Sequence, residues 1–293
     1  MANTIAGVNL AEIAQESLPG LSSTFSPLNA VSTDFSTDAA AAGESVTTRI
    51  PTKPTAQNLA SGYTHNDTTL VAKTITLDTF YGFTYGFTDA ERSKSAINLG
   101  EIFIEPALSA LGDKVFGDLW NLVMHATFST NTTITAANFD RDDLADLRAT
   151  LNDTLKAPAQ GRALICDSQH YAALLKTLNA AEIPGMTAEK QDGAVPRVAG
   201  FDIYETNLAD DNGENTAAFA MHRSSLLFAG RSVDATGAAE AGVEVADVVI
   251  PGLGLPVQFR RWYDPSLGRL NYSVGLLYGV SAGADYGVRV KTA

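Results

Sequence analysis

The hydrophobic positions of this chain follow a period of two over one unusually long segment. Between residues 74 and 88, apolar side chains fall on odd positions and polar or small ones on even positions, apart from Phe80. That alternation is typical of a β-strand with one apolar and one polar face. Because the polar, turn-rich segment Ser61–Asp67 precedes it, we predict a long, exposed β-hairpin over residues 51–88.

A ribbon of this length cannot bury its apolar face on its own mate, since isolated hairpins are marginally stable in water. It has to lie on its own domain or on a partner. We therefore predict that the apolar residues of the return strand are buried against the next helix or a neighbouring subunit; they are Ile75, Leu77, Tyr81, Phe83 and Tyr85. The tip of the hairpin should contact the adjacent subunit through Tyr63, His65 and Asp67.

After the hairpin the apolar period changes to three and four, which predicts a helix. Thr88 and Glu91 have the spacing of a capping box, in which two free N–H groups at a helix start are satisfied. The apolar pattern then runs from Leu99 to about Ala126, and Pro106 predicts a kink or a restart. We expect a strut of about 28 residues, roughly 40 Å long at 1.5 Å per residue.

Residues 138–293 alternate between helical and strand patterns, which indicates a mixed α/β region. One helix should begin near Asp140, with an apolar stripe from Leu144 to Leu155, and another should be capped by Asp167 or Ser168. The predicted strands cover residues 162–166, 198–204, 217–221, 243–250, 255–263, 269–280 and 287–292. The whole chain thus has an α+β pattern.

Residues 1–50 are rich in Ser, Thr and Ala and have few large apolar side chains. Alone they could not offset a backbone ordering entropy of about 1–2 kcal/mol per residue. Two interpretations remain open, a disordered tail and an arm that becomes ordered across a neighbouring subunit. We favour the arm, because the projecting hairpin also needs a partner surface.

Composition excludes several classes of protein. With 45% hydrophobic and 18% charged residues among 293, the chain buries a core and is not wholly disordered. Its net charge of -13 argues against a general nucleic-acid or anionic-membrane binder, whose affinity rests on Lys and Arg. No apolar run reaches 18 residues, and the N-terminus lacks the basic region of a signal peptide. We expect a soluble protein made in the cytosol, in which the single Cys166 forms no intrachain disulfide.

A search for catalytic motifs finds no nucleophile elbow, phosphate-binding loop, dinucleotide fingerprint or zinc-protease helix. The four histidines are far apart and have no Cys or carboxylate at metal-ligand spacing; they are His65, His125, His170 and His222. Cys166 and His170 form the one arrangement that could activate a thiol. However, Cys166 ends an apolar strand, where a free Cys behaves as a small buried hydrophobe.

Asp210, Asn212 and Glu214 alternate as the ligands of a calcium loop do. The Gly at the sixth position and the distal bidentate Glu of that loop are missing, so we favour a hairpin turn with a solvated acidic tip. The sequence therefore predicts no catalytic residue, no cofactor and no metal site, and we expect a protein that is not an enzyme.

The order of these elements resembles that of the tailed-bacteriophage major capsid proteins, whose fold is shared with the herpesvirus capsid floor. Asp143–Leu175 is similar to the family's helix, P-x-x-G-R approach, strand and Y-x-x-L helix. Val195–Asn207 resembles its G-F-x-I-Y strand, and Ala218–Arg231 resembles the strand and H-R segment that follow. Arg260–Thr292 is similar to the closing strands with L-x-Y-G and G-V-R-V. The resemblance covers nearly the whole chain and lies in the order and spacing of these patterns.

The resemblance implies a subunit that self-assembles into hexamers and pentamers of an icosahedral head around double-stranded DNA. It implies an α+β capsid fold with five parts: an N-terminal arm (1–50), an extended β-hairpin loop (51–88), a spine helix of the peripheral lobe (89–129), an axial lobe (130–240) and C-terminal strands that complete the peripheral lobe (241–293). Such a subunit would be assembled in the host cytoplasm and found in the virion.

The implied partners are further copies of the chain, a portal and a decoration protein, with DNA packed inside without sequence-specific binding and no membrane. Family members often begin with a scaffolding domain; this chain does not, so we expect a separate scaffolding protein and non-covalent stabilisation of the shell. Two other classes stay open on the residues alone. One is a binding module such as a tail or fibre component, which would favour repeats, and the other is a small α/β enzyme.

Overall fold

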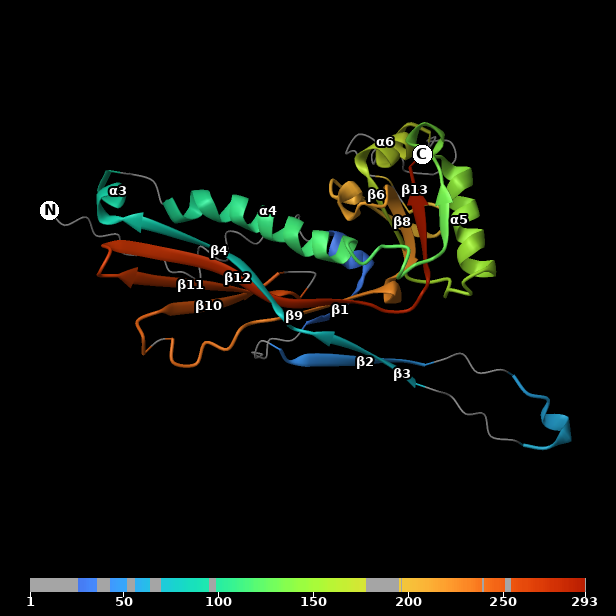
Figure 1. The fold of residues 1–293 in the computed structure, drawn as a ribbon, viewed down its shortest axis with the longest axis horizontal. Helices are drawn as coiled ribbons and strands as arrows, with labels where there is room; N and C mark the ends of the chain where they lie inside the picture. Colours follow the sequence, from blue (N-terminus) through green and yellow to red (C-terminus); the bar gives the residue numbers. More distant parts are fainter. Residues whose placement is uncertain are drawn as a thin grey trace.

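The computed structural model describes two lobes and a projecting arm (Figure 1). The residues that it describes are 26–35, 43–51, 56–63, 70–94, 99–177, 195, 197–238, 240–250 and 254–292. Within them the strands form one sheet of six, one of five and one of two. None of the helices in these ranges is both long and apolar enough to span a membrane.

The larger lobe is built on the six-stranded sheet, whose central strand is β12. This strand pairs with β11 and then β9 along one edge, and with β4 along the other. β1 adds to β9 in parallel and β10 to β11 in antiparallel orientation. The strands are β1 (Ser32–Phe35), β4 (Thr79–Thr88), β9 (Leu226–Arg231), β10 (Glu244–Val249), β11 (Pro256–Asp264) and β12 (Arg269–Ala282).

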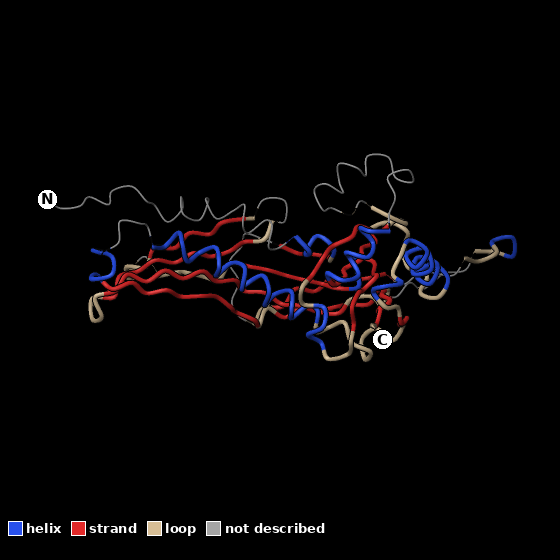
Figure 2. Tube along the Cα trace, turned by 90° about the horizontal axis from the view of Figure 1, so that it is seen from above, coloured by secondary structure: helices blue, strands red, loops and turns tan. Residues whose placement is uncertain are grey.

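One face of this sheet is covered by the helix α4 (Leu99–Trp120), as Figures 1 and 2 show. Leu108, Leu111 and Val115 pack there into the main core with side chains of the sheet. The short helix α3 (Asp89–Lys94) comes before it, and the predicted capping box is confirmed. The amide of Thr88 donates to Glu91 Oε2 at 2.8 Å, and the amide of Glu91 donates to Thr88 Oγ1 at 3.3 Å.

The predicted restart of the helix at Pro106 does not occur, because α4 runs through this residue. The helix instead ends at Trp120, before the apolar pattern does. Leu122 and Val123 belong to the turn that follows but still pack with the main core. The apolar pattern of the sequence therefore continues beyond the end of the helix, because Leu122 and Val123 fill the same core as the side chains of α4.

The smaller lobe holds the five-stranded sheet, in the order β5-β13-β8-β6-β7. The predicted helices are confirmed: α5 starts after a capping box at Asp140, and the carboxylate of Asp167 accepts the amide of His170 in the first turn of α6. The elements are β5 (Asn131–Thr133), α5 (Arg141–Asp153), β6 (Arg162–Asp167), α6 (Ser168–Thr177), β7 (Phe201–Thr206), β8 (Thr216–His222) and β13 (Gly287–Lys291). Five short 3₁₀ turns complete the described elements: η1 (Ser26–Ala30), η2 (Leu59–Ser61), η3 (Ala136–Asn138), η4 (Ala209–Asn212) and η5 (Arg223–Ser225).

The arm is a two-stranded ribbon of β2 (Ser45–Pro51) and β3 (Leu70–Thr76) that projects from the body of the subunit. The prediction of one continuous return strand is wrong, since the strand breaks at Leu77 and Asp78. After the break, the chain leaves β2 and continues as β4, which pairs with β12. The alternation continues through the break because both strands have one buried face, although each faces a different partner.

Candidate functional site: the projecting arm and its base

The base of the arm is fixed to its own subunit. Ile75 and Leu77 are 3% and 1% exposed and pack with Leu227, Ala229 and Leu277 of β9 and β12. Leu277 lies on the face of the sheet opposite α4, since its neighbours Leu276 and Tyr278 belong to the core under that helix. The prediction that Ile75 and Leu77 bury against the spine helix or a neighbouring subunit is therefore corrected. The break after β3 turns their face onto the back of their own sheet.

A glycine in β12 makes this crossing possible. A Cβ on Gly279 would lie 2.1 Å from the carbonyl oxygen of Thr76, so a side chain there would clash with the backbone of β3. The backbone of Leu77 is held on both sides, donating to Glu44 O at 2.8 Å and accepting from the amide of Gly43 at 2.7 Å. The arm therefore leaves the body from a rigid base.

The tip of the arm is exposed. Asn58 caps η2, its Oδ1 accepting the amide of Ala60 at 3.0 Å. Tyr63 is 89% exposed, and Leu59 is also exposed. His65 and Asp67 lie outside the described residues. Both views show the tip beyond the body of the subunit (Figures 1 and 2).

The remaining three predicted contact residues lie on β4. Phe83 packs partly buried against the main core under α4. The ring of Tyr81 is half exposed, with Lys114 Nζ of α4 4.7 Å from its centroid. Tyr85 is half buried and lies opposite Tyr272 in the sheet. These residues fix β4 to its own subunit.

A hydrogen-bonded group holds α4 to the sheet. The phenol of Tyr278 donates to Asp118 Oδ2 at 2.6 Å, and Lys114 Nζ lies 2.6 Å from Asp118 Oδ1. Burial and the neighbouring carboxylate of Asp118 raise the pKa of the Tyr278 phenol. Tyr278 thus stays protonated and acts as a permanent donor to the helix.

The turn after α4 is tied to the smaller lobe. Buried Arg289 of β13 donates to Phe128 O at 2.7 Å, pairs with Glu214, and lies 3.1 Å from His125 Nδ1. Asn212 Nδ2 donates to Val123 O at 2.9 Å. Asn212 is buried and Glu214 is partly buried in this contact, so the predicted solvated turn is corrected at these two residues. They serve as a joint between the lobes.

The pair formed by Cys166 and His170 does not make a reactive thiol. Cys166 is fully buried, and burial, Asp167 and Glu205 raise its pKa. Its sulfur contacts Tyr204 O at 3.8 Å, whereas His170 Nδ1 lies 2.7 Å from Asp167 Oδ1. Both residues hold the smaller lobe together.

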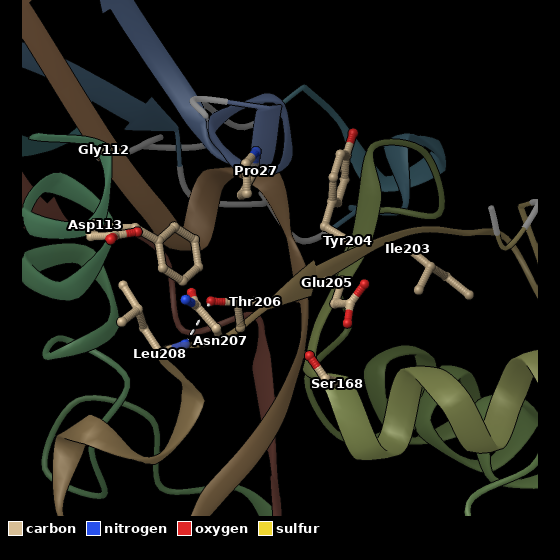
Figure 3. Close-up of a pocket in the computed structure, with 11 residues that line it drawn as sticks. Pro27, Gly112, Asp113, Ser168, Ile203, Tyr204, Glu205, Thr206, Asn207 and Leu208 are labelled. Atoms are coloured by element: carbon tan, nitrogen blue, oxygen red, sulfur yellow. Dashed lines mark hydrogen bonds between the residues drawn. The ribbon is translucent and has the colours of Figure 1, made fainter. Parts of the chain in front are cut away.

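A pocket of about 450 Å³ opens where α4, β7 and the start of α6 meet. Figure 3 shows Asp113 of α4 and Glu205 of β7 on two of its sides, with Ser168 near Glu205. The hydroxyl oxygen of Thr206 accepts the amide of Leu208 at 3.2 Å. Across the described part of the chain, no three His, Cys, Asp or Glu side chains gather closely enough to hold a metal ion.

The comparisons with known proteins agree with this architecture. A model of the family described as phage capsid protein matches residues 69–290. No curated protein sequence matches this chain. Solved structures match along most of its length: the capsid of Ralstonia phage GP4 has a TM-score of 0.59 at 8% identity, covering 89% of this chain and 86% of that chain.

Two further structures show the same fold. A chain of Mycobacterium phage Che8 has a TM-score of 0.54 at 17% identity, covering 85% of this chain and 84% of that one. The capsid of a native GTA particle has a TM-score of 0.54 at 12% identity, covering 100% and 94%. At these identities the structures establish the fold alone, and they confirm the predicted α+β capsid architecture. The family match spans about three quarters of the sequence, and the chain therefore belongs to the phage capsid protein family.

Proposed function

We propose that this major capsid subunit self-assembles into hexamers and pentamers of an icosahedral phage head that encloses double-stranded DNA. The observation that carries the proposal is the arm, because its ribbon leaves the subunit from a rigid base and ends in an exposed tip. A two-stranded ribbon is marginally stable alone, so it requires a partner surface. In a symmetric assembly, another copy provides that surface repeatedly.

Each part of the chain then has a role in the shell. The N-terminal arm (1–50) ties neighbouring subunits, although β1 pairs with β9 of its own subunit and β2 forms half of the ribbon. The loop of residues 51–88 reaches across the adjacent subunit through Tyr63, His65 and Asp67. The spine helix (89–129) and the C-terminal strands (241–293) form the peripheral lobe, apart from β13, which belongs to the five-stranded sheet of the smaller lobe. Residues 130–240 form the axial lobe at the centre of each capsomer, apart from β9, which belongs to the six-stranded sheet of the larger lobe. The family supports a structural role for the chain and no turnover of a substrate.

The proposed environment is the virion, after assembly in the host cytoplasm. A separate scaffolding protein, a portal and a decoration protein complete the partners. The net charge of -13 supports loose packing of DNA, because a basic lining would hold phosphates tightly and hinder ejection.

The test is to delete Gly62–Asn66 from the tip. Since the base of the arm packs on β9 and β12 without the tip, we expect a folded subunit that assembles poorly. Size-exclusion chromatography and negative-stain microscopy, with a co-encoded scaffold, measure shells against free subunits. Normal shells from the deletion would refute the role of the tip, and a wild-type chain that never assembles would refute the shell.

A second test concerns covalent cross-links between subunits. We expect the shell to be held by non-covalent contacts. Shells boiled in detergent should therefore run as a single 30.9 kDa band on a denaturing gel. A ladder of higher bands would contradict this expectation.

A further inference from the structure

We infer that the arm contacts a second copy of this chain through one of its two faces only, the face that contains Val71 and Lys73. This inference rests on the proposed function and adds the surface and its charge. Antiparallel partners that lie opposite each other project to the same side of a ribbon. The register pairs Val46 with Ile75 and Thr48 with Lys73. Val46, Thr48, Val71, Lys73 and Ile75 therefore share one side, called here the inner face.

The inner face begins as part of the subunit's own core. Ile75 is buried on the back of the six-stranded sheet, and Val46 packs partly buried against the same cluster. Further out, Thr48 and Lys73 are half buried, and Val71 is 41% exposed. The inner face thus continues outward from a packed surface to a point where its own subunit no longer covers it.

The opposite side of the ribbon, called here the outer face, is more exposed than the inner face. Its described residues are all exposed; they are Ser45, Thr47, Arg49, Leu70, Ala72, Thr74 and Thr76. The hydroxyl oxygens of Thr47 and Thr74 are hydrogen-bonded to each other at 3.3 Å. These two polar groups are therefore satisfied without a contact from a second subunit. Apart from Leu70 at its far end, the outer face is small, polar and charged, as a solvent-facing surface would be.

Charge indicates what covers the inner face. Residues 45–76 contain three basic residues and one acidic one, within a chain of net charge -13. Residues 45–76 are therefore a basic segment of an acidic protein, and another copy offers the arm a complementary surface. Lys73 places one of these basic charges on the inner face, near Val71, and Arg49 places another on the outer face. Ile75 and Val46 already pack on a surface of their own subunit. A second copy that lies next to this surface would cover Val71 and Lys73.

Labelling of an introduced thiol tests the face directly. The one native Cys166 is fully buried and does not compete for a maleimide. We expect Val71→Cys to react rapidly in free subunits and at least tenfold more slowly in shells. Ala72→Cys, one residue along on the outer face, should react at similar rates in both. Protection of Ala72→Cys, or equal rates for Val71→Cys in shells and free subunits, would overturn the inference.

Charge reversal gives an independent test with a matched control. Lys73→Glu and Arg49→Glu change the net charge equally and lie on opposite faces of the same ribbon. We expect Lys73→Glu to lower the yield of shells at least tenfold and Arg49→Glu to leave it within twofold of wild type. Circular dichroism melting of the free subunits should be the same for both, because neither side chain is buried in the core.

The outcomes of these experiments distinguish a failure of the inference about the inner face from a failure of the proposed function. If both reversed variants assemble normally, or Arg49→Glu is the more damaging, the inference fails while wild-type shells leave the proposed function standing. If wild-type protein with its scaffold forms no shells, the proposed function fails and the inference with it.

Discussion

Buried arginine explains one of the local patterns that the sequence shares with capsid proteins. In the P-x-x-G-R segment, Arg162 is 1% exposed and donates to Pro158 O, Ala157 O and Asn152 Oδ1 at 2.6–2.8 Å. Gly161 before it adopts a φ of +70°, a conformation that favours glycine. The pattern thus joins the end of α5 to β6 through one side chain.

Removing this side chain should weaken the smaller lobe. Arg162→Ala leaves two backbone carbonyls and one amide oxygen without their donor, so we expect the free energy of unfolding to fall by about 3 kcal/mol. Urea unfolding of the free subunit measures this. Arg197→Ala is the control, because its ion pair with Asp202 is exposed and worth about 0–1 kcal/mol. Equal effects of the two changes would contradict the role of Arg162.

The carboxylate of Asp167 makes the free energy of unfolding depend on pH. Burial at this site raises its pKa, but the side-chain and backbone hydrogen bonds from His170 outweigh burial and lower the pKa below its ordinary value. Because the unfolded chain binds this proton more readily, the stabilisation is present above about pH 4 and is lost as the pH falls further.

Asp167→Asn tests this dependence. The amide cannot ionise, so we expect the free energy of unfolding at pH 7 to fall by about 1–2 kcal/mol, with a smaller further loss between pH 5 and pH 3 than in the wild type. Urea unfolding at a series of pH values measures both effects. An unchanged loss in acid would show that other carboxyl groups carry it.

At the scale of elements, the position of α4 depends on few polar contacts. Asp118→Ala removes the acceptor of the buried Tyr278 phenol, so we expect it to lower the free energy of unfolding by about 2 kcal/mol. Lys114→Ala should cost less than about 1 kcal/mol, since that ion pair is partly exposed. Tyr278→Phe combined with Asp118→Ala should be less destabilising than the sum of the two. An additive result would contradict the contact.

The elements themselves could largely be predicted from local signals. The capping boxes at Thr88 and Asp140 mark two helix starts, and β11 and β12 follow a clear strand pattern. The break between β3 and β4 could not be predicted, because alternation reports a buried face but not which strand is opposite. For the same reason, Ile75 and Leu77 could be recognised as buried but not placed on β9 and β12.

At the scale of the molecule, the sequence indicates the arm but not which part of it is free. The alternating residues divide between a fixed base, a sheet strand and a short ribbon. The joint around Arg289 could not be foreseen either, because its partners Glu214 and Phe128 are far away in sequence. The sequence could establish the order of the elements, and the resemblance to the capsid protein family rests on that order.

The place of β12 and β13 in the chain has a consequence for synthesis. Every strand that pairs with β12 precedes it in the sequence, and so does every partner of β13. During translation, neither sheet can close until these two strands have left the ribosome. A nascent polypeptide that has not reached β12 lacks the middle of one sheet and an inner strand of the other. The order of the strands thus makes the closure of both sheets depend on strands that are translated after all of their partners.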